Sequence, residues 1–191
     1  MIGIGLSAGW GAIRKILLKS PIVSPIPSPS LSPIPSLSPT PLSRQFIPYT
    51  NGQYSFSIGY PDDWYVSENA SPNSIVSFSE KETGGANVNI GGGTTTPTMT
   101  VDSLINATNG ELKKVYADYL VQNTSTITIG SVSARLVEVT FSAGGVKAKQ
   151  RYLYIFPKAG NYLVIIATSG EESWTAYNQV FNQMFGSFRL L

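Results

Sequence analysis

The pattern of apolar and polar positions divides the chain into three segments. Residues 1–20 are mostly apolar and rich in glycine, with a short basic end. Residues 21–43 are dominated by Pro and Ser, and residues 44–191 show the alternating and helical patterns of a folded domain. The sequence therefore predicts one globular domain, at 44–191, that follows two segments of a different kind.

The strongest strand pattern lies near the start of the domain. Its apolar positions recur at every second residue and are Tyr54, Phe56, Ile58 and Tyr60. Period two places these side chains on one buried face of a sheet. Pro61 cannot donate a ladder hydrogen bond, so we expect the strand to end there, and Trp64 then returns a large apolar ring to the core.

The rest of the domain contains seven further strand patterns and two helix patterns. The strands are predicted over residues 65–67, 75–79, 86–90, 126–129, 134–141, 147–156 and 162–167. The helices are predicted over 101–121 and 171–185, capped by Thr100 and by Ser169 or Gly170. Glu171 and Glu172 then fall in a first helical turn, where the helix dipole favours anions.

Two local patterns complete the fold prediction. Residues 162–167 are apolar on both faces, which is typical of a central strand that is covered on each side. The glycine-rich run 91–97 is read as a mobile loop. The element order predicts an α+β fold, an α/β/α sandwich around a mostly antiparallel sheet, with the order ββββ–α–ββββ–α give or take one strand.

The two N-terminal segments are read as an attachment and a spacer. The apolar run in residues 1–20 is shorter than the roughly 20 residues that span a bilayer. Three interpretations of this run are open: an anchor whose true start lies upstream, a weak signal-like segment, or an amphipathic patch on a membrane surface. We favour a membrane-associated N-terminus. Residues 21–43 favour polyproline II, which at about 3.1 Å per residue holds the domain up to roughly 70 Å away. The alternative for this segment is a ligand for a proline-binding module.

Charge is distributed unevenly between these segments. Residues 1–43 contain Arg14, Lys15 and Lys19 and no acid, giving +3, whereas residues 44–191 hold the other ten bases and all eleven acids, giving −1. Because the domain is nearly neutral, we expect no nucleic-acid partner.

The composition also excludes several kinds of chemistry. The chain contains no Cys and no His. This removes disulfides, thiol nucleophiles, the usual Cys/His zinc sites and every catalytic triad that needs imidazole.

Two stretches of the domain resemble the PsbP-like family. The opening phrase Tyr49-Thr50-Asn51 … Tyr54-Ser55-Phe56-Ser57-Ile58 … Tyr60-Pro61 … Trp64 is similar to the start of PsbP-like domains, and Phe181 … Met184-Phe185 … Ser187-Phe188 is similar to their end. The resemblance covers about residues 46–190. Its signature positions are Tyr54, Phe56, Tyr60, Pro61, Trp64, Trp174, Phe181 and Phe188.

The resemblance implies the α/β/α sandwich and a non-catalytic role, since the family shares no catalytic residues. PsbP proteins are extrinsic subunits on the lumenal side of photosystem II, tied to its manganese–calcium cluster. Relatives include assembly factors, tethered bacterial proteins and, in fold only, a nuclear-import factor that binds Ran. The resemblance alone implies Ca²⁺ as a cofactor; otherwise we expect none. The chain departs from photosynthetic members in its Pro/Ser spacer and in its lack of a lipid-bearing Cys and of His.

Two groups of charged residues are candidate sites. Lys147, Lys149 and Arg151 alternate on one strand face with no acid among them, so if exposed they form a basic stripe for an acidic partner or anionic headgroups. The alternative is a charged face that keeps the strand soluble. Asp62 and Asp63 beside Trp64 could bind a hard cation such as Ca²⁺, although two adjacent carboxylates are few ligands and a turn cap is the favoured interpretation.

Three functions remain open from the sequence. The favoured one is a non-catalytic, membrane-tethered interaction domain in the periplasm, at the cell surface or in the thylakoid lumen, in its narrower form a subunit of a photosystem II type complex. Its partners would be membrane-complex proteins or an anionic surface. The second is a cell-surface module that binds a ligand or polymer. The third is a small hydrolase that uses carboxylates such as Asp62, Asp63, Glu138 and Glu171.

Overall fold

The computed structural model describes residues 44–71, 73–82 and 85–191, so the predicted membrane segment and the spacer lie outside the described residues. The elements in chain order are β1 (Phe46–Asn51), β2 (Phe56–Pro61), β3 (Tyr65–Ser71), β4 (Ser74–Ser79), β5 (Asn87–Thr94), α2 (Val101–Val115), β6 (Leu120–Ile129), β7 (Val132–Ala143), β8 (Val146–Lys158), β9 (Asn161–Gly170), α3 (Trp174–Ser187) and β10 (Arg189–Leu190). Within the described ranges, no helix is long and apolar enough to cross a bilayer.

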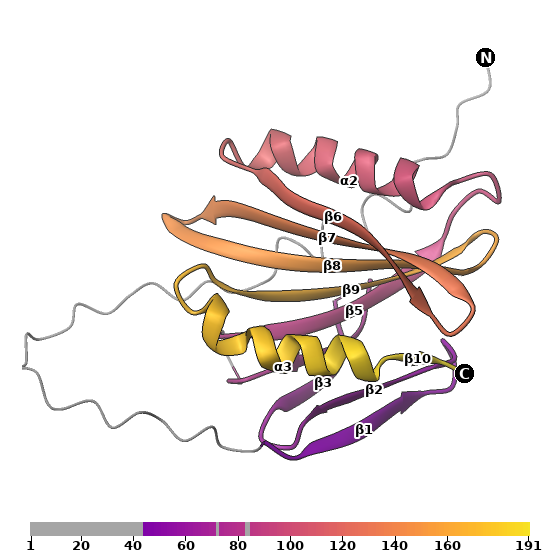
Figure 1. The fold of residues 1–191 in the computed structure, drawn as a ribbon, viewed down its shortest axis with the longest axis horizontal. Coiled ribbons are helices and arrows are strands. Elements are labelled where there is room, and N and C mark those ends of the chain that lie inside the picture. The colour runs from indigo at the N-terminus through magenta and orange to yellow at the C-terminus, as the bar shows by residue number, and fades with distance from the viewer. Residues whose placement is uncertain (1–43, 72, 83–84) are drawn as a thin grey trace, which may run out of the picture.

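The strands form two sheets in which every pairing is antiparallel (Figure 1). The larger has the order β3-β4-β5-β9-β8-β7-β6, and the smaller has the order β1-β2-β10. Strand β9 lies in the middle of the larger sheet and is buried along most of its length. The prediction of a central strand at 162–167 is therefore confirmed.

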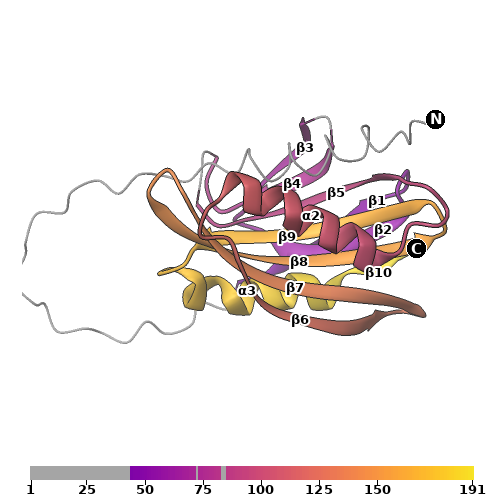
Figure 2. The same cartoon turned by 90° about the horizontal axis from the view of Figure 1, so that it is seen from above.

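Helices α2 and α3 lie on opposite faces of the larger sheet (Figures 1 and 2), and each face has its own hydrophobic core. Alternate residues of β8 show this: Tyr152 and Tyr154 belong to the core under α2, and Leu153 and Ile155 belong to the core under α3. The smaller sheet joins the α3 side, where Phe56 stacks on Phe188 at 5.7 Å between ring centroids. The predicted α+β fold is confirmed, with a small second sheet added to one helical layer.

The signature residues of the opening and closing phrases mostly meet in the α3 core. Trp64 and Trp174 both contact Phe181, at centroid distances of 6.4 Å and 5.2 Å. Tyr60 is half-buried against Phe78, and Pro61 is buried. Tyr54 is the exception, because it is 40% exposed and lies in the β1–β2 turn rather than in the strand.

Helix α2 is shorter than predicted. Thr100 caps it as expected, since its hydroxyl oxygen accepts from Ser103 N at 3.1 Å, and Asn109-Gly110 does not interrupt it. The helix ends at Val115 because Tyr116 adopts an extended conformation. Asp118 then accepts hydrogen bonds from the backbone and side chain of Ser142, which fixes the turn into β6.

The prediction of a mobile glycine loop at 91–97 is wrong for its first half. Gly91 to Thr94 continue β5 and pair with β9. A Cβ on Gly92 would lie 2.8 Å from both Leu163 Cδ2 and the Tyr162 carbonyl oxygen. Glycine at this position therefore permits close strand packing rather than mobility.

Helix α3 begins later than predicted, at Trp174. The residue before it, Ser173, makes no side-chain cap bond, and Glu171 N donates instead to Lys147 O at 3.0 Å. Glu171 and Glu172 thus precede the helix and do not occupy its first turn. Strand β1 was not predicted, and β6 is longer than the predicted 126–129.

Candidate functional site: a basic groove beside α3

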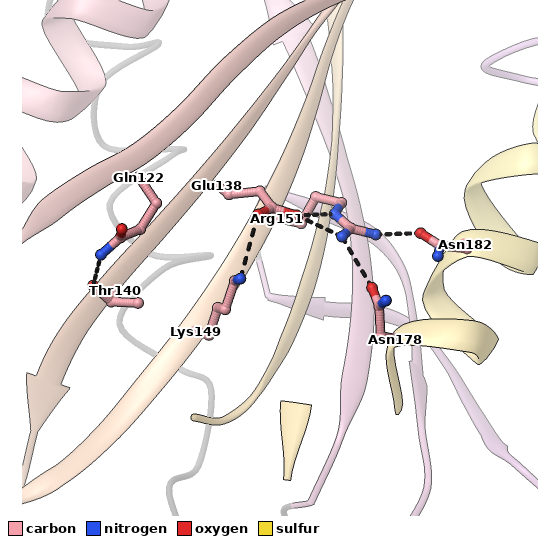
Figure 3. Close-up of polar contacts among 7 residues, drawn as sticks. All are labelled: Gln122, Glu138, Thr140, Lys149, Arg151, Asn178 and Asn182. Carbon is pink, nitrogen blue, oxygen red and sulfur yellow. Dashed lines mark hydrogen bonds and ion pairs between the residues drawn. The ribbon is translucent and has the colours of Figure 1, made fainter. Parts of the chain in front are cut away.

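A cluster of three charged side chains lies on the α3 face of the larger sheet. Glu138 of β7 pairs in register with Arg151 of β8, and Thr140 pairs with Lys149. Arg151 Nε donates to Glu138 Oε1 at 2.8 Å, and Lys149 Nζ lies 3.3 Å from Glu138 Oε2. One carboxylate therefore lies between two cations (Figure 3).

Helix α3 fixes the orientation of the guanidinium. Asn178 Oδ1 accepts from Arg151 Nη2 at 3.0 Å, and Asn182 Oδ1 accepts from Arg151 Nη1 (Figure 3). The Trp174 ring lies beneath both cations, with its centroid 5.0 Å from Lys149 Nζ and 5.3 Å from Arg151 Cζ. Hydrogen bonds from two elements and the cation–π contact hold the cluster in one geometry.

The cluster is partly buried and carries an excess of positive charge. The exposed fractions of the side chains are 10% for Arg151, 18% for Glu138 and 23% for Lys149. Burial alone raises the pKa of Glu138, but the Arg151 guanidinium and the Lys149 ammonium outweigh it and hold that pKa below its ordinary value. Arg151 and Lys149 share the single carboxylate of Glu138, so the cluster carries a formal charge of +1 where water has little access. A bound anion would offset this charge.

Two adjoining cavities lie next to this cluster, and of the two only the first is lined by α3. A first cavity of about 490 Å³ has Ile127 and Leu136 on its sheet side and Phe185 on its helix side, with Arg151 and Asn182 also in its lining. A second cavity of about 730 Å³ shares Ile129, Gly130 and Arg189 with the first. We call the two together the α3 groove.

The charged side chains that line the α3 groove are all basic. The lining contains Arg151, Arg189 and Lys158 and no Asp or Glu. Among the described residues, neither Arg189 nor Lys158 forms an ion pair. Arg189 Nη1 donates to the carbonyl oxygens of Gly186 and Phe188, each at 2.7 Å, which anchors this side chain at the end of α3.

The structure does not place Lys147, Lys149 and Arg151 in an exposed basic stripe. Lys147 is exposed and lies 3.8 Å from Glu171, whereas Lys149 and Arg151 share Glu138. The expectation of an exposed stripe without acids is wrong, because the acids come from the neighbouring strand and from the segment before α3. Binding of a partner by these three residues stays a prediction.

The other candidate carboxylates are separated. Asp62 and Asp63 lie in an exposed turn, where Asp63 is 3.5 Å from Arg44 Nε. Glu138 and Glu171 are each paired with cations. In the part of the chain that the structure describes, no group of three or more His, Cys, Asp or Glu could hold a metal ion. Calcium binding at Asp62 and Asp63 therefore stays a prediction, and among the described residues no third acidic side chain forms a metal-binding group with them.

Sequence reasoning missed Glu138 as the partner of Arg151, although a signal was present. The turn between β7 and β8 contains Gly144 and Gly145, which both have positive φ, as a two-residue hairpin turn requires. Such a turn pairs Ala143 with Val146 and hence Glu138 with Arg151. The spacing of Asn178 and Asn182, four residues apart, also marks one helix face. No local pattern points to Lys158 or Arg189.

Comparisons with known proteins give one family match and several fold matches. A family model described as DcrB matches residues 61–187. No curated protein sequence matches the chain. Cyanobacterial PsbP (CyanoP) from Synechocystis sp. PCC 6803 is similar in structure, with a TM-score of 0.63, 13% identity and coverage of 81% of this chain and 98% of CyanoP.

Two further solved structures share this fold. One is LpqN, involved in cell envelope biogenesis of Mycobacterium tuberculosis, with a TM-score of 0.60, 16% identity and coverage of 78% of this chain and 91% of LpqN. The other is the Saccharomyces cerevisiae Ran-binding protein Mog1p, with a TM-score of 0.53, 10% identity and coverage of 78% and 96%. At these identities the likeness shows the fold alone, so the expected PsbP-like resemblance is confirmed for the fold.

Proposed function

Because this chain belongs to the DcrB family, we propose that it is a non-catalytic protein-interaction domain that works outside the cytoplasm, tethered to a membrane through residues 1–43. The involvement of LpqN in cell envelope biogenesis supports this location, since LpqN has the same fold. The apolar segment followed by a Pro/Ser spacer in this chain supports the tether.

The observation that carries the proposal is the α3 groove. It combines an apolar floor, made by residues such as Leu136 and Phe185, with cations that α3 and β8 hold in place. Fixed cations beside the partly buried apolar side chains of a cavity favour contact with a partner of opposite charge. A domain that served only as a spacer, or only to keep the protein soluble, would not need cations held in fixed positions.

The absence of catalysis rests on the chemistry of the chain. It has no imidazole and no thiol, and the carboxylates Glu138 and Glu171 are paired with cations. General acid–base work needs a carboxyl group whose proton can be exchanged near the working pH, and a carboxyl whose pKa is lowered is poorly suited to it.

A narrower form of the same function is an extrinsic subunit of a photosynthetic complex. The similarity to CyanoP over nearly the whole of that protein favours it. The broader envelope role and this narrower one differ in the partner and not in the site, so one experiment separates them.

That experiment is membrane fractionation of cells that express the full chain, followed by cross-linking and identification of bound proteins. We expect recovery in the membrane fraction with a defined protein partner. Arg189→Glu should reduce the cross-linked yield, whereas Lys113→Glu should not, because Lys113 is exposed on α2 at the opposite face.

Each outcome has a distinct meaning. Photosystem subunits as partners establish the narrower role, and other envelope proteins establish the broader one. Recovery with cell-wall polymer in place of any protein would contradict the proposal in favour of a polymer-binding module. Recovery in the soluble cytoplasm would contradict the tether.

A further inference from the structure

We propose that the α3 groove binds an extended segment of a partner protein in which apolar side chains stand between two carboxylates. This inference rests on the proposed interaction function and specifies the chemistry of the partner. It follows from the charges of the groove, its length and the polar groups along its walls.

The charged side chains of the groove favour an anionic occupant, chiefly at Arg189 and Lys158, because Arg151 is already paired with Glu138. Arg151 lines one cavity, Lys158 lines the other, and Arg189 lines both. The chain has eleven acids, yet none of the Asp or Glu side chains lines either cavity. Among the described residues, Arg189 donates hydrogen bonds only through Nη1, to Gly186 and Phe188, so its Nε and Nη2 donors remain available to a ligand.

The spacing of the cations suits a chain rather than a single anion. Arg151 and Lys158 are seven residues apart on β8, which corresponds to roughly 20 Å of strand. An extended peptide of about seven residues covers that length. The floor between them is apolar, with Ile127, Leu136 and Phe185 in the first cavity and Leu163 in the second.

The walls favour a peptide over an acyl chain. Hydroxyl and amide side chains line the groove along its length, namely Gln53, Ser55, Thr94, Thr128, Asn161 and Asn182. These groups can hydrogen-bond the backbone N–H and C=O groups of a peptide. An acyl chain would cover them without offering partners, and unpaired polar groups cost free energy when they lose water.

The free edge of β6 offers a competing mode of peptide binding. Its ten residues, Leu120–Ile129, contain no charge and no proline, and among the described strands β6 pairs only with β7. Such an edge can accept an added strand through backbone hydrogen bonds. Edge pairing would be insensitive to charges at the ends of the peptide, whereas binding in the α3 groove would depend on them.

The test is an NMR titration of the uniformly ¹⁵N-labelled full chain. The first probe is acetyl-Asp-Leu-Ser-Val-Ser-Leu-Asp-amide, and the matched probe replaces both Asp residues with Lys. We expect the acid-ended peptide to shift amide signals in 127–130 and 182–189, and raised salt to weaken it. The Lys-ended peptide should produce no saturable shifts there.

Two variants and one control assign the binding to the groove cations. Lys158→Glu changes an exposed side chain with no ion-pair partner among the described residues, so its folding should be unaffected. It and Arg189→Glu should each weaken the acid-ended peptide by about tenfold. Lys113→Glu on α2 should leave the affinity unchanged.

The inference is overturned by three results. These are no saturable binding of the acid-ended peptide, equal binding of both peptides with shifts along β6, and tighter binding of oleate than of the acid-ended peptide. A failure here leaves the proposed function standing if membrane cross-linking still recovers a protein partner. If no partner is recovered while the peptide binds the groove, the proposed function fails and the inference stands.

Discussion

The two faces of the larger sheet are closed in different ways. Under α2 the buried polar groups are uncharged, and its tyrosines are Tyr119, Tyr152, Tyr154 and Tyr162. Under α3 the core is made of Phe, Trp and aliphatic side chains, but it ends at a charged cluster of Glu138, Lys149 and Arg151. The α3 face also carries the groove, while helix α2 contributes no residue to it.

This difference separates stability from function. Burying neutral hydroxyl groups costs little free energy. Removing two cations and a carboxylate from water costs much more, even when they are paired. A charged cluster is therefore poor material for stability alone. Its presence beside the first cavity of the α3 groove fits a contact role.

The largest expected effect compares the two cores directly. Phe181 is fully buried and contacts Trp64, Trp174 and Tyr177. We expect Phe181→Ala to lower the free energy of unfolding by about 4 kcal/mol. Leu112→Ala, the matching truncation under α2, should lower it by about 2.5 kcal/mol. Urea unfolding measures both, and a larger loss for Leu112→Ala would reverse the comparison.

The next effect concerns the charged cluster. Arg151→Met removes the cation that makes most of the contacts of Glu138 and should cost about 3 kcal/mol. The double variant Glu138→Leu with Arg151→Met should recover part of that loss, since the buried carboxylate is then removed together with the guanidinium, while Lys149 loses its carboxylate partner. The control is Arg135→Met, whose exposed partner Asp102 lies on α2, with an expected loss of about 0.5 kcal/mol. Equal losses for Arg151→Met and Arg135→Met would refute the distinction.

Two glycine substitutions, one in β5 and one in α2, should change the stability of the protein by smaller amounts and in opposite directions. Gly92→Ala should destabilise the protein by about 2 kcal/mol, because its Cβ would meet Leu163 and the backbone of Tyr162. Gly110→Ala in α2 meets nothing within 4 Å and should stabilise it by about 0.7 kcal/mol. Thermal unfolding distinguishes the two, and a tolerated Gly92→Ala would mean that β5 and β9 are less closely packed than described.

The smallest effect is a pH dependence that differs between the faces. The folded pKa of Glu138 is lowered below its ordinary 4.5, so its contribution is present above pH 4.5 and is lost as pH falls through the folded value. Burial raises the pKa of Tyr119, Tyr152 and Tyr162 above the ordinary 10.0, so their contribution is present below pH 10 and is lost at higher pH.

Unfolding free energies across the pH range check both arms. Glu138→Gln should flatten the acid arm and leave the alkaline arm unchanged. An acid arm that keeps its full slope in Glu138→Gln would place the responsible carboxyl elsewhere, for example at Asp118, whose pKa is lowered by its hydrogen bonds to Ser142.

Local pattern was enough for the central strand and for the existence of both helices. The run 162–167 is apolar on both faces, and such a run has few other places in a fold. The ends of the helices were not predictable in the same way. The turn after α2 depends on Asp118 meeting Ser142, and the residues before α3 are held by Lys147, which are contacts between distant parts of the chain.

The candidate site was also predictable from the sequence only in part. The alternation of Lys147, Lys149 and Arg151 was visible in the sequence, and the two-glycine turn could have supplied Glu138. The contacts of Arg151 with Asn178 and Asn182, and the approach of Arg189 to the β6–β7 turn, depend on where α3 packs. Helix packing is a tertiary result that no spacing within the sequence encodes.

The central claim is that the α3 groove, and not the α2 face, contacts the partner. The most direct measurement places a photo-cross-linking amino acid at Asn182 in one variant and at Lys113 in another, in membranes of cells that express the full chain. We predict a specific cross-linked protein from position 182 and none from position 113. Equal cross-linking from both positions, or cross-linking from 113 alone, would contradict the account.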